Sequence, residues 1–141
     1  PRKAMVVVMV QLKGFRVNSV SFENKVQNGT QLKLKNHFNY NVSYMDGENK
    51  CIGTLNFKIA DENMLPFEIK LEIVAEFAYQ SGDDKGDIHV ESFDQLFPSL
   101  RQFINSLTAT CGMPGLMIPY IALDRDKVNV SENEKEESAL N

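Results

Sequence analysis

The side chains that could do chemistry are few in this sequence and stand far apart. The soft ligands and nucleophile or base candidates are Cys51, Cys111, His37 and His89. They lack the paired spacing of a structural zinc site and form no nucleophile–base motif. We therefore expect no catalytic residue, no metal site and no cofactor. We interpret the two histidines as surface residues and Cys111 as a structural thiol.

Acidic clusters supply the remaining reactive groups. Asp83-Asp84 and Asp124-Arg125-Asp126 could bind a cation weakly, but carboxylates this close together in a loop are normally solvated. The chain has no glycine-rich phosphate loop, no nucleophile elbow and no HExxH pattern. The sequence therefore offers little basis for catalysis, which favours a binding protein over an enzyme.

Composition places these residues in a soluble globular chain. The 141 residues are enough for one domain, and 43% of them are hydrophobic. Lysine and arginine number 15 against 19 aspartate and glutamate, so the net charge of −4 argues against a nucleic-acid binder. The apolar run at residues 6–10 is too short for a signal peptide or a membrane span. We expect a cytoplasmic protein without membrane insertion.

Period-two alternation in the first two-thirds of the chain predicts antiparallel strands with one wet face. Three of these strands carry their apolar residues on one face: Leu32, Leu34, Phe38, Tyr40, Val42 and Tyr44; Leu55, Phe57 and Ile59; and Phe67, Ile69, Leu71, Ile73, Ala75, Phe77 and Tyr79. Asp46-Gly47 predicts a hairpin turn between the first two. In the opening strand the alternation changes phase at Lys13-Gly14, which predicts a β-bulge.

In the last third of the chain the spacing of the apolar residues changes. Apolar residues recur at helical spacing from Leu96 to Leu107, which predicts a helix capped by Asp94, with Pro98 within its first turn or so. Pro114 and Pro119 then forbid a regular helix, so residues 113–123 form an extended apolar loop. The polar, acidic residues 129–141 are expected to be disordered. The predicted fold is α+β: a four-stranded antiparallel sheet, one long helix, an extended apolar loop and a short or absent second helix.

The apolar loop has two interpretations. Its apolar side chains could cover one edge of the sheet, or some of them could line a groove for apolar partners. Methionine suits the second role because its side chain is flexible and polarisable. Periodicity does not decide between the two.

Several pieces of the chain, in order, resemble the bacterial export chaperone family SecB. Leu96-Phe97-Pro98-Ser99-Leu100-Arg101 is similar to the start of the family's long helix. Gly112, Pro114-Gly115-Leu116-Met117-Ile118 and Asp124 are similar to its helix-connecting loop. Val20-Ser21-Phe22-Glu23 is similar to the end of its first strand. The resemblance covers about residues 10–124, and it suggests residues 1–128 as a SecB-like chaperone domain before a tail at 129–141.

The resemblance implies an ATP-independent holdase that binds unfolded polypeptides during protein export. It also implies a homotetramer, built as a dimer of dimers, in which residues 6–12 form a sheet edge that needs a partner. The client-binding residues it implies are Met113, Leu116, Met117, Ile118, Tyr120, Ile121 and Val26. A dedicated chaperone or partner of one client, such as an antitoxin or a phage protein, is the alternative.

The family also docks its motor ATPase, SecA, on an acidic surface of the sheet. Glu23 matches that pattern, whereas Ser19 and Lys70 stand where acidic residues are usual. SecA therefore stays open as a partner. The crossover at residues 24–30 is shorter than is usual in the family, and the chain after Asp124 lacks the apolar pattern of a second helix.

Overall fold

The computed structural model describes residues 9–128 and the backbone of residues 135–139. It confirms the α+β fold, with a long helix after the strands and a single 3₁₀ turn in place of a second helix. The elements are β1 (Gln11–Asn24), β2 (Leu34–Met45), η1 (Asp46–Glu48), β3 (Lys50–Asp61), β4 (Phe67–Ala78), α1 (Lys85–Thr110), η2 (Arg125–Lys127) and β5 (Lys135–Ala139).

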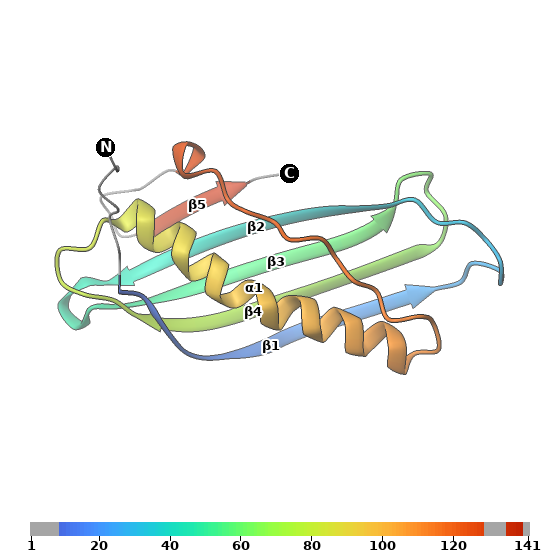
Figure 1. The fold of residues 1–141 in the computed structure, drawn as a ribbon, viewed down its shortest axis with the longest axis horizontal. Coiled ribbons are helices and arrows are strands. Elements are labelled where there is room, and N and C mark those ends of the chain that lie inside the picture. Colours follow the sequence, from blue (N-terminus) through green and yellow to red (C-terminus); the bar gives the residue numbers. More distant parts are fainter. Residues whose placement is uncertain (1–8, 129–134, 140–141) are drawn as a thin grey trace, which may run out of the picture.

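The strands form one antiparallel sheet in the order β1-β4-β3-β2-β5. β1 therefore pairs with β4, and the connection between β1 and β2 crosses the ends of β4 and β3. Helix α1 lies across one face of the sheet, which we call the inner face (Figure 1). The opposite, outer face carries the alternate side chains of each strand.

The alternation read from the sequence separates these two faces. On β4 the residues from Phe67 to Phe77 at every second position are buried, and the intervening residues from Glu68 to Glu76 are partly or fully exposed. The register places β2 and β3 in phase with β4, so their aromatic and branched residues join one core under α1. The hairpin turn at Asp46-Gly47 is confirmed as η1.

β1 forms the edge of the sheet opposite β5, and its register is interrupted twice. The predicted bulge at Lys13-Gly14 is confirmed by a register shift between Leu12 and Gly14. A second shift, between Val17 and Ser19, restores the phase of the alternation. Next to the first bulge, the side-chain amide of Gln95 in α1 donates to the Val10 carbonyl (2.6 Å) and accepts from the Leu12 amide (3.0 Å). Val6 to Val8 lie outside the described residues.

The helix begins ten residues earlier than its apolar periodicity predicts. Asp84, not Asp94, is the N-cap, and its carboxylate accepts a hydrogen bond from the Asp87 amide (3.0 Å). Pro98 therefore lies well inside α1 rather than in its first turn. The periodicity fails in the first turns because the inward face there carries polar His89 and Ser92, both fully buried.

The end of the chain also differs from the expectation of a disordered tail. Residues 135–139 pair with Asn39–Ser43 of β2 as the fifth strand. Ladder hydrogen bonds use backbone groups, and the outer edge of β2 offers unpaired ones, so a polar sequence can pair there. Residues 129–134 and 140–141 of the predicted tail lie outside the described residues.

Tyr40 joins the sheet to the helix at the centre of the core. Its hydroxyl group and the Ser92 hydroxyl group of α1 are 2.6 Å apart and hydrogen-bonded, and both residues are fully buried. The His89 and Phe93 rings make edge-to-face contacts with the Tyr40 ring, with centroid distances of 5.1 and 5.4 Å. The Tyr40 ring lies directly over Gly53 of β3, where any Cβ atom would collide with it.

We expect Gly53→Ala to lower the free energy of unfolding by about 1–3 kcal/mol, because the added methyl group overpacks a fully buried site. Chemical denaturation monitored by circular dichroism measures this change. Gly47→Ala is the matched control, because a Cβ atom at Gly47 has no neighbour within 4 Å. Equal stability of the two variants would contradict the close packing of Tyr40 on Gly53.

Candidate functional site

The apolar loop runs back along α1 after the helix ends. We call residues 113–124 the return segment; it crosses the inner face of the sheet on the side of α1 toward β2 and β3 (Figure 1). It has no helix or strand structure, as its two prolines predict. Its apolar residues divide into three groups. Ile118 and Leu123 are buried; Met113, Leu116 and Ile121 are half-buried against the core; Met117 and Tyr120 are exposed.

The first anchor of the return segment is at the C-terminal end of α1. The Thr108 hydroxyl group accepts a hydrogen bond from the Leu116 amide (2.8 Å) and donates one to the Ile104 carbonyl (2.9 Å). Thr108 is fully buried, so this contact satisfies a backbone donor that water does not reach. The side chain of Asn105, one turn away, donates to the Leu116 carbonyl (3.4 Å).

The second anchor is Tyr120, near the middle of the helix. Its hydroxyl group donates a hydrogen bond to the Asp94 carboxylate, and its ring makes an edge-to-face contact with the Phe97 ring at a centroid distance of 5.6 Å. The hydrogen bond to Asp94 raises the pKa of the Tyr120 phenol above its usual value. Tyr120 is held by these contacts and still leaves 59% of its surface exposed.

The third anchor holds the chain at the N-terminal end of α1. Arg125, the first residue of η2, binds Asp84 through Nη2 (2.5 Å) and Asp87 through Nε (2.8 Å). The guanidinium group lies against Gly86, where a Cβ atom would collide with it. These contacts tie the return segment to both ends of the same helix.

The structure brings six of the seven predicted client-binding residues onto the return segment and leaves Val26 apart. Val26 is in the crossover after β1, where it is half-buried against the core. Ile118 is 3% exposed, so in the described chain it packs in the core rather than facing a partner. Met117 is 64% exposed and Tyr120 is 59% exposed, which makes these two the most accessible of the set.

The first interpretation of the apolar loop is therefore confirmed for two residues, and the second stays a prediction. Ile118 and Leu123 cover the sheet, as the first interpretation requires, while Met117 and Tyr120 face outward. Sequence reasoning missed the anchors, which join residues up to 41 positions apart. A signal was present at one of them: Asn105 and Thr108 are three residues apart and lie on one face of the helix.

Among the histidine and cysteine side chains, two lie in environments that differ from the prediction. His89 is fully buried, which corrects its interpretation as a surface residue; it packs against Tyr40 because that part of α1 faces the sheet. Cys51 is buried and Cys111 is exposed, so Cys111 is not the buried structural thiol that was expected. Within residues 9–128, no group of three or more His, Cys, Asp or Glu side chains is arranged to hold a metal ion.

Glu23, the predicted motor-docking residue, is exposed on the outer face at the end of β1. Its carboxylate forms an ion pair with Lys25 (3.5 Å). Ser19 and Lys70 also lie on the outer face, where Lys70 is directly opposite Ser21 of β1. The described part of the chain contains no helix that is long and apolar enough to cross a membrane.

The fold described above is similar to that of a SecB-like chaperone of known structure. The chain superposes on the SecB-like chaperone Rv1957 of Mycobacterium tuberculosis, whose structure was solved in complex with a ChAD peptide from the Rv1956 HigA1 antitoxin. The TM-score is 0.67 and the sequence identity 15%, over 79% of this chain and 90% of that one.

A protein of unknown function from Streptococcus agalactiae has a similar structure. It gives a TM-score of 0.55 at 15% identity, over 82% of this chain and 100% of that one. No family model matches the sequence, and no curated protein matches it either. At this level of identity the similarity is one of fold, so the chain is a divergent example of the SecB-like architecture.

Acid should weaken the third anchor. Burial raises the pKa of Asp84, but hydrogen bonds from the Asp87 amide and the Arg125 guanidinium outweigh it and hold the pKa below its ordinary value of 3.8. Because the folded pKa is the lower one, the stabilising contribution is complete above about pH 3.8 and is lost as the pH falls through the folded value. We expect Arg125→Gln to lower the free energy of unfolding by at most about 1 kcal/mol, since the groups are partly exposed.

This difference between wild type and Arg125→Gln should be constant at neutral and mildly acidic pH and should shrink below about pH 3.8. Urea denaturation at a series of pH values measures it. Lys127→Gln, in the same turn, is the control, because Lys127 forms no ion pair with a described residue. A difference between wild type and Arg125→Gln that stays constant into strong acid would contradict the role of Asp84.

Proposed function

We propose that the protein is an ATP-independent chaperone that holds non-native polypeptides, and that it binds them along the return segment. The observation that carries this proposal is the exposure of Met117 and Tyr120 on a segment anchored to α1 at three points. Exposed apolar residues on an anchored segment present a preformed surface, so a client does not have to order it on binding. The proposed function is one of binding, without catalysis.

The chemistry of the segment suits unfolded clients. Met117 is flexible and polarisable, so it can adapt to many apolar side chains. Met113, Leu116 and Ile121 are half-buried beside it and extend the apolar surface. Each such contact is weak, and the affinity for a client would be summed over several of them. In this proposal Ile118 holds the segment on the core, and Val26 contributes from the crossover.

We also propose that the protein assembles into a homo-oligomer, with a dimer of dimers as the expected form. The supporting observation is the edge strand β1, whose core-facing residues are incompletely covered. The register places Phe15 opposite Ala75 and Val20 opposite Leu71, and yet 46% of Phe15 and 44% of Val20 is exposed. A second copy that meets this edge would bury these side chains and pair the edge of the sheet.

A dedicated chaperone for one client is the second candidate. The observation that favours it is that Rv1957, which shares this fold, was solved with a peptide from an antitoxin. Such a protein would bind one short linear segment tightly and would have little general holdase activity. We place either activity in the cytoplasm. SecA is not included in the proposal, because Ser19 and Lys70 occupy outer-face positions where the SecB family usually has acidic residues.

Suppression of aggregation tests the holdase. Excess protein should reduce the light scattering of thermally unfolded citrate synthase without nucleotide. Met117→Asn should weaken binding of an unfolded client about fivefold, since burial of the exposed part of this side chain contributes about 1 kcal/mol. Charged substitutions at Ile118 are unsuitable, because this residue is in the core.

Met64→Asn is the matched control for Met117→Asn. Met64 is 90% exposed in the turn between β3 and β4, away from the return segment, so the same substitution should leave client binding unchanged. Equal loss in both variants would reject the return segment as the binding surface. Unchanged aggregation with wild-type protein would reject general holding and leave the dedicated chaperone as the candidate.

Light scattering coupled to size-exclusion chromatography tests the assembly. We expect wild-type protein to elute with a mass near four times that of the chain. Replacing Phe15 and Val20 by Ser should produce smaller species without loss of the far-UV spectrum, since neither side chain is in the buried core. A monomeric wild-type protein would reject the proposed assembly.

A further inference from the structure

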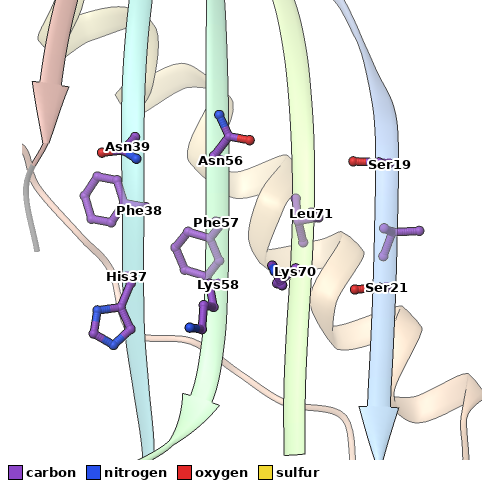
Figure 2. A pocket seen from close by; sticks show the side chains of 11 residues that line it. Ser19, Ser21, His37, Phe38, Asn39, Asn56, Phe57, Lys58, Lys70 and Leu71 are labelled. Atoms are coloured by element: carbon purple, nitrogen blue, oxygen red, sulfur yellow. The ribbon is translucent and has the colours of Figure 1, made fainter.

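The outer face of the sheet contains a hollow on the side away from α1 and the return segment. Its volume is about 460 Å³, and it extends across β2, β3, β4 and β1. Figure 2 shows the side chains that line it, with α1 behind the strands; of these, Phe38, Phe57 and Leu71 are buried in the core. Small polar residues leave this space open: Ser19, Ser21, Asn39 and Asn56.

Basic side chains form one row across the hollow. The strand register places His37 directly opposite Lys58, and Lys58 directly opposite Lys70. Directly opposed like charges destabilise a sheet. Lys58 has partial relief from Glu68, at 3.7 Å, whereas Lys70 forms no ion pair with any described residue. The sheet therefore maintains an unfavourable pair of lysines at the rim of an open hollow.

A second hollow lies farther along the same face. Its volume is about 510 Å³, and its lining includes Lys13, Gly14, Arg16, Ile52 and Val74. From Lys70 to Glu76 of β4 the two hollows together extend about 20 Å at the rise of a strand. That is the length of about six residues of extended polypeptide.

Acidic residues around the hollows limit what can bind there. Glu72 accepts a hydrogen bond from Asn18 (3.2 Å), Glu23 pairs with Lys25, and Glu76 pairs with Lys50 (4.0 Å). A nucleic-acid backbone requires a continuous basic track, which these carboxylates interrupt. A short peptide can instead place its carboxylates at Lys58 and Lys70 and pass the acidic positions with neutral residues.

We propose that the outer face is a second docking surface, which binds an extended acidic peptide segment through Lys58, Lys70 and His37. The serine hydroxyl and asparagine amide groups around them supply hydrogen bonds to the carboxylates and to the backbone of the peptide. The site lies on the opposite face from the return segment, so it does not depend on client binding there. A partner with an acidic linear segment could thus bind while the inner face holds a client.

Fluorescence anisotropy with a labelled decapeptide of alternating Glu and Ser tests this site at low salt. Wild-type protein should bind it at least about tenfold more tightly than the matching Gln-Ser peptide, and added salt should weaken the binding. Lys58→Gln combined with Lys70→Gln should reduce the affinity about tenfold. Lys25→Gln combined with Lys33→Gln removes the same charge outside the hollow and should change it less than twofold.

Four results would overturn the proposal. Equal loss of affinity in the two double variants would mean that the peptide senses only net charge. Displacement of the peptide by low millimolar inorganic phosphate would indicate a small-anion site. Binding of a twenty-nucleotide oligothymidylate more tightly than the acidic peptide would indicate a nucleic-acid surface. Met117→Asn should not affect the affinity for the acidic peptide; if it does, the peptide binds at the return segment instead.

Stability supplies an independent readout. Lys70→Glu removes the like-charge pair with Lys58, so it should raise the melting temperature of the free protein and abolish binding of the acidic peptide. A purely structural role for Lys70 predicts the reverse change in stability. A lower melting temperature, or peptide binding that survives in Lys70→Glu, would contradict the proposal.

Discussion

The width of the sheet is the constraint on which the rest of the structure depends. Neighbouring strands lie about 4.8 Å apart and a helix is about 10 Å across, so one helix cannot cover the inner face of β1 to β4. The return segment covers part of what α1 leaves open, and the burial of Ile118 and Leu123 is the direct result. Because Pro114 and Pro119 exclude a second helix there, this cover is an extended chain that needs side-chain anchors for its backbone.

An extended cover has a consequence that a helix would not have. Successive side chains of an extended chain point in different directions, so the residues beside a buried one face outward. Ile118 is buried while the preceding residue, Met117, is exposed, and the same anchors hold both. The stability of the fold and the proposed client surface are therefore coupled in one segment. The edge strand β1 is the other place where the inner face of the sheet is incompletely covered, at Phe15 and Val20.

The two faces of the sheet differ in the interaction they offer. The inner face presents apolar surface, while the outer face presents charges whose arrangement is set by strand register. The net charge of −4 does not describe that face, where Lys58 and Lys70 are neighbours. These lysines are 12 residues apart in the chain, on consecutive strands of a hairpin, and their proximity depends on how β3 and β4 align. A total charge cannot report such a local pair.

The sequence by itself determined the α+β class, the faces of the strands, the first bulge and the extended nature of the return segment. Those features follow from local patterns: alternation in β4, the phase change at Lys13-Gly14, and the two prolines. Tertiary structure alone decided the start of α1, because buried His89 and Ser92 break the apolar period where Tyr40 provides a polar partner. It also decided the pairing of β1 with β4, the addition of β5, the three anchors and the basic hollow. Most of these join residues far apart in the chain, and the energy of such a contact depends on register and burial that no local pattern contains.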